Sequence, residues 1–77
     1  MTRGLFSWTA EDVIRFLKAR GFALVHTRGS HFFYAGCPHG TYRQVTVPFH
    51  GKTDIKPRTL KGIILQSGIS KDEWIKR

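Results

Sequence analysis

The hydrophobic positions nearest the N-terminus recur at helical spacing. Apolar side chains three and four positions apart would form one stripe on a helix, namely Ala10, Val13, Ile14 and Leu17. Ser7 and Thr9 both suit the N-cap position, and Gly21 suits the residue that follows a helix C-terminus. Phe16 lies beside the centre of the stripe, and we expect it at the edge of the buried face. The pattern predicts a first helix between Thr9 and Gly21.

The pattern then changes to a period of two, which is typical of strands. Three alternating segments follow, joined by short glycine-containing turns: residues 22–27, 31–35 and 42–47. In the first segment Phe22, Leu24 and His26 would share one face, so we expect His26 to be partly buried. Pro48 cannot donate a ladder hydrogen bond and is expected to end the third strand. Short turns between consecutive strands favour an antiparallel meander.

A second helical pattern follows a polar loop. Its apolar stripe comprises Leu60, Ile63 and Ile64. Pro57 suits the first turn of this helix, and Gly68 suits its C-terminal end. Ser70 and Glu73 have the spacing of a capping box, which predicts a short C-terminal helix. We therefore expect one α+β domain over residues 1–77, a two-layer α-β-β-β-α arrangement with helices on one face of a three-stranded antiparallel sheet.

The charge of the chain is strongly positive and unevenly distributed. Lys and Arg number 13 against 5 Asp and Glu, which gives a formal net charge of +8. Asp54 is the one acidic residue between Val13 and Lys71. Such a surface attracts polyanions, so the charge indicates a nucleic acid or an acidic protein as partner. A basic surface without a partner is the plain alternative.

Cysteine usage and hydropathy narrow the classes of protein. Cys37 is the single cysteine, which excludes an internal disulfide and favours a reducing compartment. No apolar run approaches the roughly 20 residues of a membrane span, and the N-terminal residues lack the apolar core of a signal peptide. We therefore expect a cytoplasmic protein that does not enter a membrane.

Metal-dependent chemistry is not expected from the residue pattern. Cys37 and His39 are close in sequence, but one thiol and scattered imidazoles do not make a structural zinc site. Paired carboxylates that would hold Mg²⁺ for two-metal chemistry do not stand out either. The sequence predicts no metal and no cofactor.

The segment RGSHFFY, residues 28–34, places a histidine directly after a Gly-Ser turn. Gly29 allows a tight turn, and backbone amides near Gly29 and Ser30 would suit a phosphate. Imidazole transfers protons near neutral pH, so His31 is the candidate general acid or base. Arg28 beside it would stabilise negative charge. The alternative is a structural histidine that opens a strand and bonds to the backbone.

Other polar and aromatic residues could contact a nucleic acid. Basic side chains around the start of the second helix are candidate phosphate contacts: Lys52, Lys56, Arg58 and Lys61. His50, at the end of the third strand, is a candidate second proton carrier or phosphate contact, and a loop histidine without such a role is the alternative. Alternation along the strands places half of the strand aromatics in the core, and the others could stack on bases. The strand aromatics are Phe32, Phe33, Tyr34 and Tyr42.

An ordered set of motifs resembles the HicA toxins. The segments RGF, RGSH, TVPFH and KPRTLKGIILQSGIS occur in this order, and the resemblance runs from about Thr9 to Trp74. It implies a fold like that of the double-stranded-RNA-binding domain (dsRBD), cleavage of mRNA, and neutralisation by a HicB-type antitoxin protein. It also implies that His31 is the active-site histidine, and His50 falls at a matching position. Many relatives carry a second histidine where this chain has Phe32, and glycine where it has Arg58.

The expected reaction is cleavage of RNA without a metal. The 2′-hydroxyl of RNA can attack the adjacent phosphorus when a protein residue removes one proton and supplies another. His31 would carry the proton, and a 2′,3′-cyclic phosphate is the expected product. A non-catalytic RNA-binding module of the same fold is the alternative function, and a domain whose basic face binds an acidic protein is a third.

Overall fold

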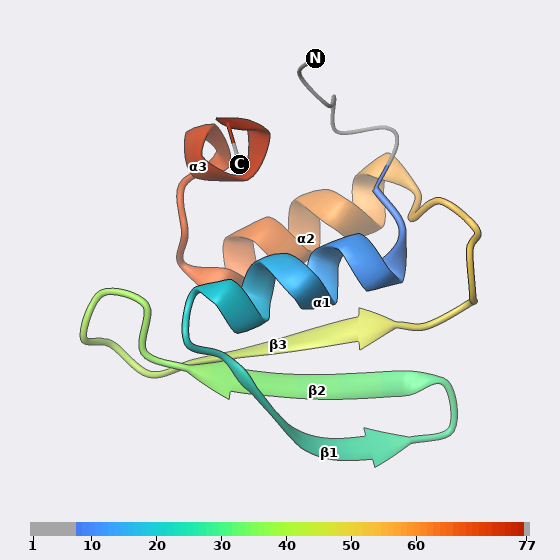
Figure 1. Ribbon diagram of the computed structural model, residues 1–77, viewed down its shortest axis with the longest axis horizontal. Helices are drawn as coiled ribbons and strands as arrows, with labels where there is room; N and C mark the ends of the chain where they lie inside the picture. Colours follow the sequence, from blue (N-terminus) through green and yellow to red (C-terminus); the bar gives the residue numbers. More distant parts are fainter. Residues whose placement is uncertain (1–7, 77) are drawn as a thin grey trace.

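The computed structural model describes residues 8–76, so the expected N-cap role of Ser7 lies outside the described part. Three helices and a three-stranded sheet make up the fold (Figure 1). In chain order they are α1 (Ala10–Ala19), β1 (Ala23–Arg28), β2 (His31–Gly36), β3 (Arg43–Pro48), α2 (Pro57–Ser67) and α3 (Lys71–Lys76). This confirms the predicted α-β-β-β-α order and the short C-terminal helix.

Local interactions determine both ends of α1. Thr9 is the N-cap: its hydroxyl accepts a hydrogen bond from the Asp12 amide at 3.2 Å, and the Asp12 carboxylate accepts one from the Thr9 amide at 3.0 Å. At the other end Gly21 has φ 89°. The Phe22 amide donates to the Leu17 carbonyl at 3.0 Å, which completes a Schellman motif. The predicted start and end of the first helix are therefore confirmed.

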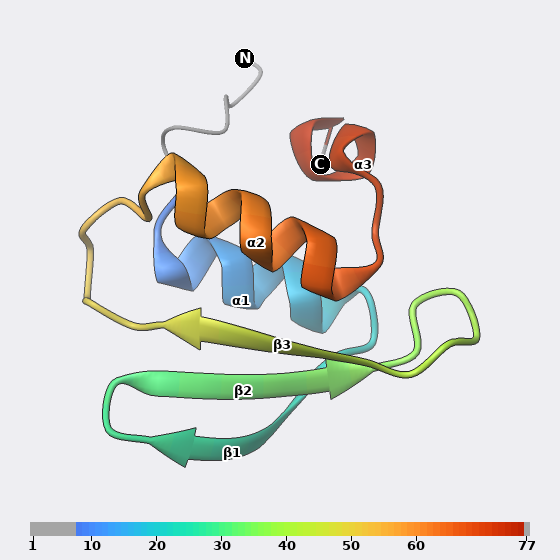
Figure 2. The same cartoon turned by 180° about the vertical axis from the view of Figure 1, so that it is seen from behind.

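The sheet is an antiparallel meander in the order β1-β2-β3. Helices α1 and α2 run side by side next to β3, and β1 lies farthest from them (Figures 1 and 2). The edge of β3 is tied to α2, because the Thr46 amide donates to the Gln66 side chain at 3.0 Å. Strand β1 is exposed along its whole length. One edge of the sheet is therefore free and the other is held by a helix.

A β-bulge in β1 corrects the prediction for His26. The register with β2 pairs Leu24 with Tyr34 but His26 with Phe33, so Val25 is the extra residue. The bulge places Leu24 and His26 on opposite faces of the sheet, although strict alternation would have put them on the same face. The expectation of a partly buried His26 is wrong, because its side chain is exposed.

The core lies between the sheet and the helices and extends to α3. Its largest fully buried side chains are Trp8, Trp74, Leu17, Leu60, Val13, Val45, Val47 and Ser67. Phe16 was expected at the edge of the helix stripe but is only 4% exposed. Its ring stacks on Trp74 of α3 at 4.0 Å and meets Trp8 edge-on at 5.9 Å. Burial of the Tyr34 hydroxyl in this core raises its pKa above the ordinary value of 10.0.

Helix α2 begins and ends as predicted. Pro57 occupies its first turn, and Gly68 ends it in the left-handed conformation with φ 72°. Leu65 points away from the core and is 78% exposed.

Helix α3 is held by Glu73. The Trp74 amide donates to the Ser70 carbonyl at 3.4 Å, and the Glu73 carboxylate accepts a hydrogen bond from Arg20. Arg20 also lies over the Phe16 ring, 4.6 Å from its centroid. These contacts join the C-terminal helix to the end of α1.

Within residues 8–76, no helix combines the length and the hydropathy that a membrane crossing requires.

Candidate active site

The turn between β1 and β2 presents His31 to solvent. Gly29 and Ser30 form a two-residue turn in which only Gly29 has positive φ, at 58°, as in a type II′ hairpin. Arg28 and His31 flank the turn and pair directly across the two strands. The Ser30 carbonyl accepts a hydrogen bond from the Phe49 amide at 2.7 Å, which ties the turn to the end of β3. The His31 side chain is exposed, so the turn holds it at an accessible position.

Alternation along β2 shows which face of the sheet His31 occupies. Phe32 and Tyr34 lie on the helix side, since Phe32 packs against the core and stacks on Phe49 at 5.1 Å, and Tyr34 is only 3% exposed. His31 and Phe33 therefore lie on the opposite, uncovered face. Strand aromatics thus divide as expected, with Phe32 and Tyr34 toward the core.

Four side chains gather on this uncovered face at the hairpin end. The register pairs Arg28 with His31 and His26 with Phe33, and paired residues share a face. The His26 imidazole lies against the Phe33 ring, with 5.4 Å between centroids and 39° between planes. We call the group His26, Arg28, His31 and Phe33 the hairpin face. It combines two imidazoles with one guanidinium.

A shallow hollow adjoins the hairpin face. Pro48, the cross-strand partner of His31, lines this hollow of about 310 Å³ together with His50 and Lys56. The hollow lies at the N-terminus of α2, where Lys56 is the N-cap and the first turn holds no acidic residue. Such a helix end favours anions. Asp54 also lines the hollow, and its negative charge opposes part of the positive charge there.

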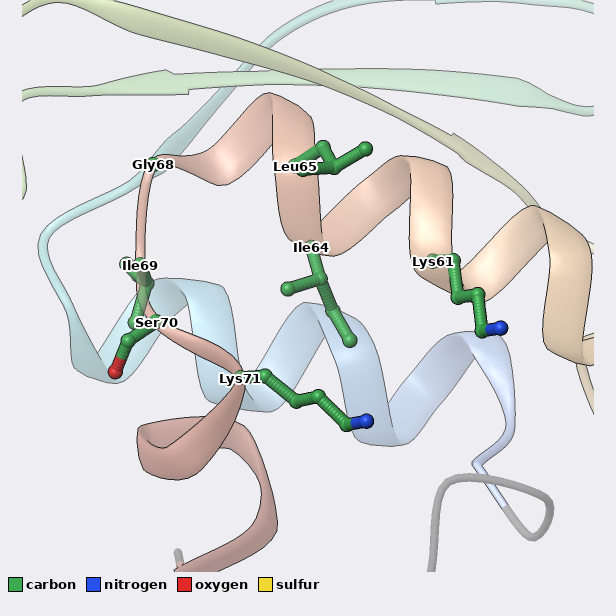
Figure 3. A pocket seen from close by; sticks show the side chains of 7 residues that line it. All are labelled: Lys61, Ile64, Leu65, Gly68, Ile69, Ser70 and Lys71. Atoms are coloured by element: carbon green, nitrogen blue, oxygen red, sulfur yellow. The ribbon is translucent and has the colours of Figure 1, made fainter.

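The remaining predicted phosphate contacts are not all at this place. Lys52 is exposed in the loop between β3 and α2. Lys61 lies in a different groove of about 520 Å³, between α2 and the start of α3 (Figure 3). There Lys61 and Lys71 flank Ile64, as Figure 3 shows. The structure therefore brings His50 and Lys56 together and separates Lys61 from them.

The other histidine and the cysteine lie outside the hairpin face. His39, in the loop between β2 and β3, lies 3.8 Å from the Glu73 carboxylate. Cys37 in the same loop is free and exposed. Among residues 8–76, no group of three or more His, Cys, Asp or Glu side chains comes together in a way that could hold a metal ion.

The hairpin face contains a residue that sequence reasoning left out. His26 was assigned to a half-buried strand face, and no role was expected of it. The shift that exposes it comes from the pairing of β1 with β2, and nothing in residues 22–27 marks Val25 as a bulge. A search of the sequence for histidines finds His26, but it does not show on which face of the sheet His26 lies.

Comparisons with known proteins give one match. A family model described as the HicA toxin of bacterial toxin–antitoxin systems matches residues 10–69. No curated protein and no solved structure matches the chain. The matched region covers both predicted histidine positions, His31 and His50, and ends just before α3.

Proposed function

The chain belongs to the HicA family of toxins of bacterial toxin–antitoxin systems, and from this premise we propose that it is an endoribonuclease that cleaves mRNA at the hairpin face. Membership of this family implies an antitoxin as its partner. The observation that carries the proposal is the exposed imidazole of His31 opposite Arg28, on a sheet face that no helix of residues 8–76 covers.

The chemistry needs a proton carrier and a stabiliser of negative charge. Attack of the 2′-hydroxyl on phosphorus requires removal of one proton and delivery of another, and an imidazole can do both near neutral pH. His31 is the general acid or base of this step, and a contribution of about 10²- to 10⁴-fold is typical of such a residue. Arg28, paired with His31 across the strands, stabilises the negative charge on the phosphoryl oxygens. The reaction uses no metal and no cofactor.

The hollow beside Pro48 extends the substrate site. Backbone amides of Gly29 and Ser30 lie at the turn that carries His31, and His50 and Lys56 line the hollow together with Pro48. We propose that His50 and Lys56 contact the phosphate next to the cleaved bond, and that Lys52 contacts the RNA strand beyond that phosphate. Lys61 faces another groove and would contact only RNA that continues around α2.

The partner that neutralises the toxin is a HicB-type antitoxin. Binding of an acidic protein surface over the hairpin face would block access of RNA to His31, since this face is uncovered in the free chain. A cytoplasmic location is part of the same proposal, because the proposed mRNA substrate would be met there.

Incubation of purified protein with mRNA in EDTA tests the nuclease proposal. Wild-type protein should cleave the RNA and leave 2′,3′-cyclic phosphate ends, whereas His31→Ala should lose at least about 10²-fold in rate. His39→Ala is the matched control, because His39 is exposed and lies at the opposite end of β2. Intact RNA with wild-type protein, or equal cleavage by His31→Ala, would reject the proposal. Salt-sensitive binding without any cleavage would instead identify a non-catalytic RNA-binding module.

A further inference from the structure

We propose that His26 is a second proton-transfer residue, which works with His31 from the neighbouring strand. This inference rests on the proposed nuclease function and adds a catalytic residue to the same site. It arises from the structure of β1, where the bulge at Val25 places His26 on the face that carries His31.

Cleavage through the 2′-hydroxyl moves two protons at two different oxygen atoms. One residue takes the proton of the 2′-hydroxyl as the bond from the 2′-oxygen to phosphorus forms. Another gives a proton to the 5′-oxygen as the bond from phosphorus to that oxygen breaks. The products are a 2′,3′-cyclic phosphate and a 5′-hydroxyl, and exchange with water restores both residues. Two imidazoles on either side of the phosphate can perform these transfers in one step.

The cross-strand register gives the two histidines a suitable separation. His26 pairs with Phe33, and Phe33 is two positions along β2 from His31. His26 and His31 are therefore diagonal neighbours on one face. The backbone positions of such neighbours lie about 7–8 Å apart. A phosphodiester group fits between side chains at this distance. Contact with the Phe33 ring, at 5.4 Å between centroids, holds the His26 imidazole on that face.

Arg28 lies at the corner between the two imidazoles. It is on the same strand face as His26, two positions along β1, and it pairs with His31. Arg28 and His31 are the charged or titratable groups that share the hairpin face with His26. Across β2, the residues of β3 on this face are Gln44, Thr46 and Pro48, which do not titrate. A phosphate between the imidazoles would meet the Arg28 guanidinium directly.

The pH dependence of single-turnover cleavage tests the role of His26. Wild-type protein should give a bell-shaped rate profile. His26→Phe keeps a ring against Phe33 but cannot titrate, so it should lose about 10²-fold or more in rate and one limb of the profile. Binding of RNA should change less than about 2-fold, because stacking is retained. His39→Phe is the matched control and should behave as wild type.

A substrate with a sulfur leaving group separates the two proton transfers. A bridging 5′-phosphorothiolate leaves as a thiolate and needs no general acid. It should restore cleavage in either His26→Phe or His31→Ala, but not in both, and the restored variant is the one that lacks the acid. Restoration in neither variant would overturn the proposal. A bell-shaped pH profile for His26→Phe with the maximum cleavage rate of the wild type would overturn it as well. If wild-type protein cleaves no RNA at all, the nuclease function itself is wrong.

Discussion

At the scale of single residues, the position of His31 depends on the turn that precedes it. Gly29 has φ 58°, in the left-handed region that residues with a side chain rarely adopt. The turn sets Arg28 opposite His31. The hydrogen bond that the Phe49 amide donates to the Ser30 carbonyl holds the turn against the end of β3. Proton transfer is sensitive to misplacement of about 1 Å. We therefore predict that the geometry of this turn matters for cleavage as well as for stability.

Substitution of Gly29 by alanine should affect both stability and cleavage. The added side chain meets no atom within 4 Å, so the loss in free energy of unfolding comes from backbone strain and should be about 1–2 kcal/mol. Movement of His31 should lower the cleavage rate by up to about 10²-fold.

Gly40 offers a matched control for this prediction. It has φ 83°, also meets no atom within 4 Å, and lies in the loop at the other end of β2. Gly40→Ala should therefore lose similar stability in urea titrations and keep its cleavage rate per folded molecule. Equal losses of activity in the two variants would show that the Gly29 turn has no special role.

At the scale of elements, the short helix α3 adds to the core beyond the region matched by the family model. Trp74 is fully buried and stacks on Phe16 at 4.0 Å. Glu73 joins Arg20, the C-cap of α1, and lies 3.8 Å from His39 in the loop between β2 and β3. Six residues in α3 therefore connect one helix and one loop that are far apart in sequence.

Removal of the Trp74 side chain should destabilise the whole fold. Trp74→Ala leaves a cavity against Phe16 and Trp8, and truncation of a buried aromatic lowers the free energy of unfolding by about 3–5 kcal/mol. Glu73→Gln removes only a partly exposed ion pair and should lose at most about 1 kcal/mol. Urea denaturation followed by circular dichroism measures both values. A loss below that of Glu73→Gln in the tryptophan variant would mean that α3 does not stabilise the core.

At the scale of the whole molecule, a net charge of +8 favours polyanions, and the fold distributes that charge over separate surfaces. Lys56 lies in the hollow next to Pro48, near the hairpin face. Lys71 lies in the groove beside Ile64, together with Lys61 (Figure 3). A lysine that binds a phosphate releases counterions from the nucleic acid. A lysine elsewhere contributes only to the general electrostatic potential of the protein.

Salt dependence of RNA binding should distinguish these surfaces. The slope of log affinity against log salt should fall by about 0.7 in magnitude for Lys56→Gln, as one phosphate contact to a single strand is lost. Lys71→Gln removes the same charge from the other groove and should leave the slope at its wild-type value. Fluorescence anisotropy with a short single-stranded RNA measures both slopes. Equal slopes for the two variants would place the RNA elsewhere.

Most features that depend on neighbours in sequence were predicted correctly. The capping box expected of Ser70 and Glu73 is the exception, because the Glu73 amide donates to the Ser70 carbonyl and the Glu73 carboxylate accepts from Arg20. Thr9 caps α1, and Gly21 and Gly68 end α1 and α2, because each of these interactions joins residues a few positions apart. The turn before His31 belongs to the same class. The turn that exposes His31 was therefore predicted, and the role of His31 in catalysis stays a prediction.

Features that depend on distant segments were predicted less well. Phe16 is buried because Trp74 of α3 stacks on it and Trp8 meets its edge. His26 changes face only because β1 pairs with β2 through a bulge. Lys61 joins another groove because of its position around α2. None of these outcomes follows from the period of the local pattern.

The amino-acid sequence by itself determined the helix ends, the order of the elements, the positive charge and the turn that presents His31. These properties come from local backbone preferences and from composition. The tertiary structure alone decided which side chains share the face of His31, because that depends on strand register and on the bulge at Val25. Pairing between strands sets the register, and a shift of one residue moves a side chain to the opposite face of the sheet.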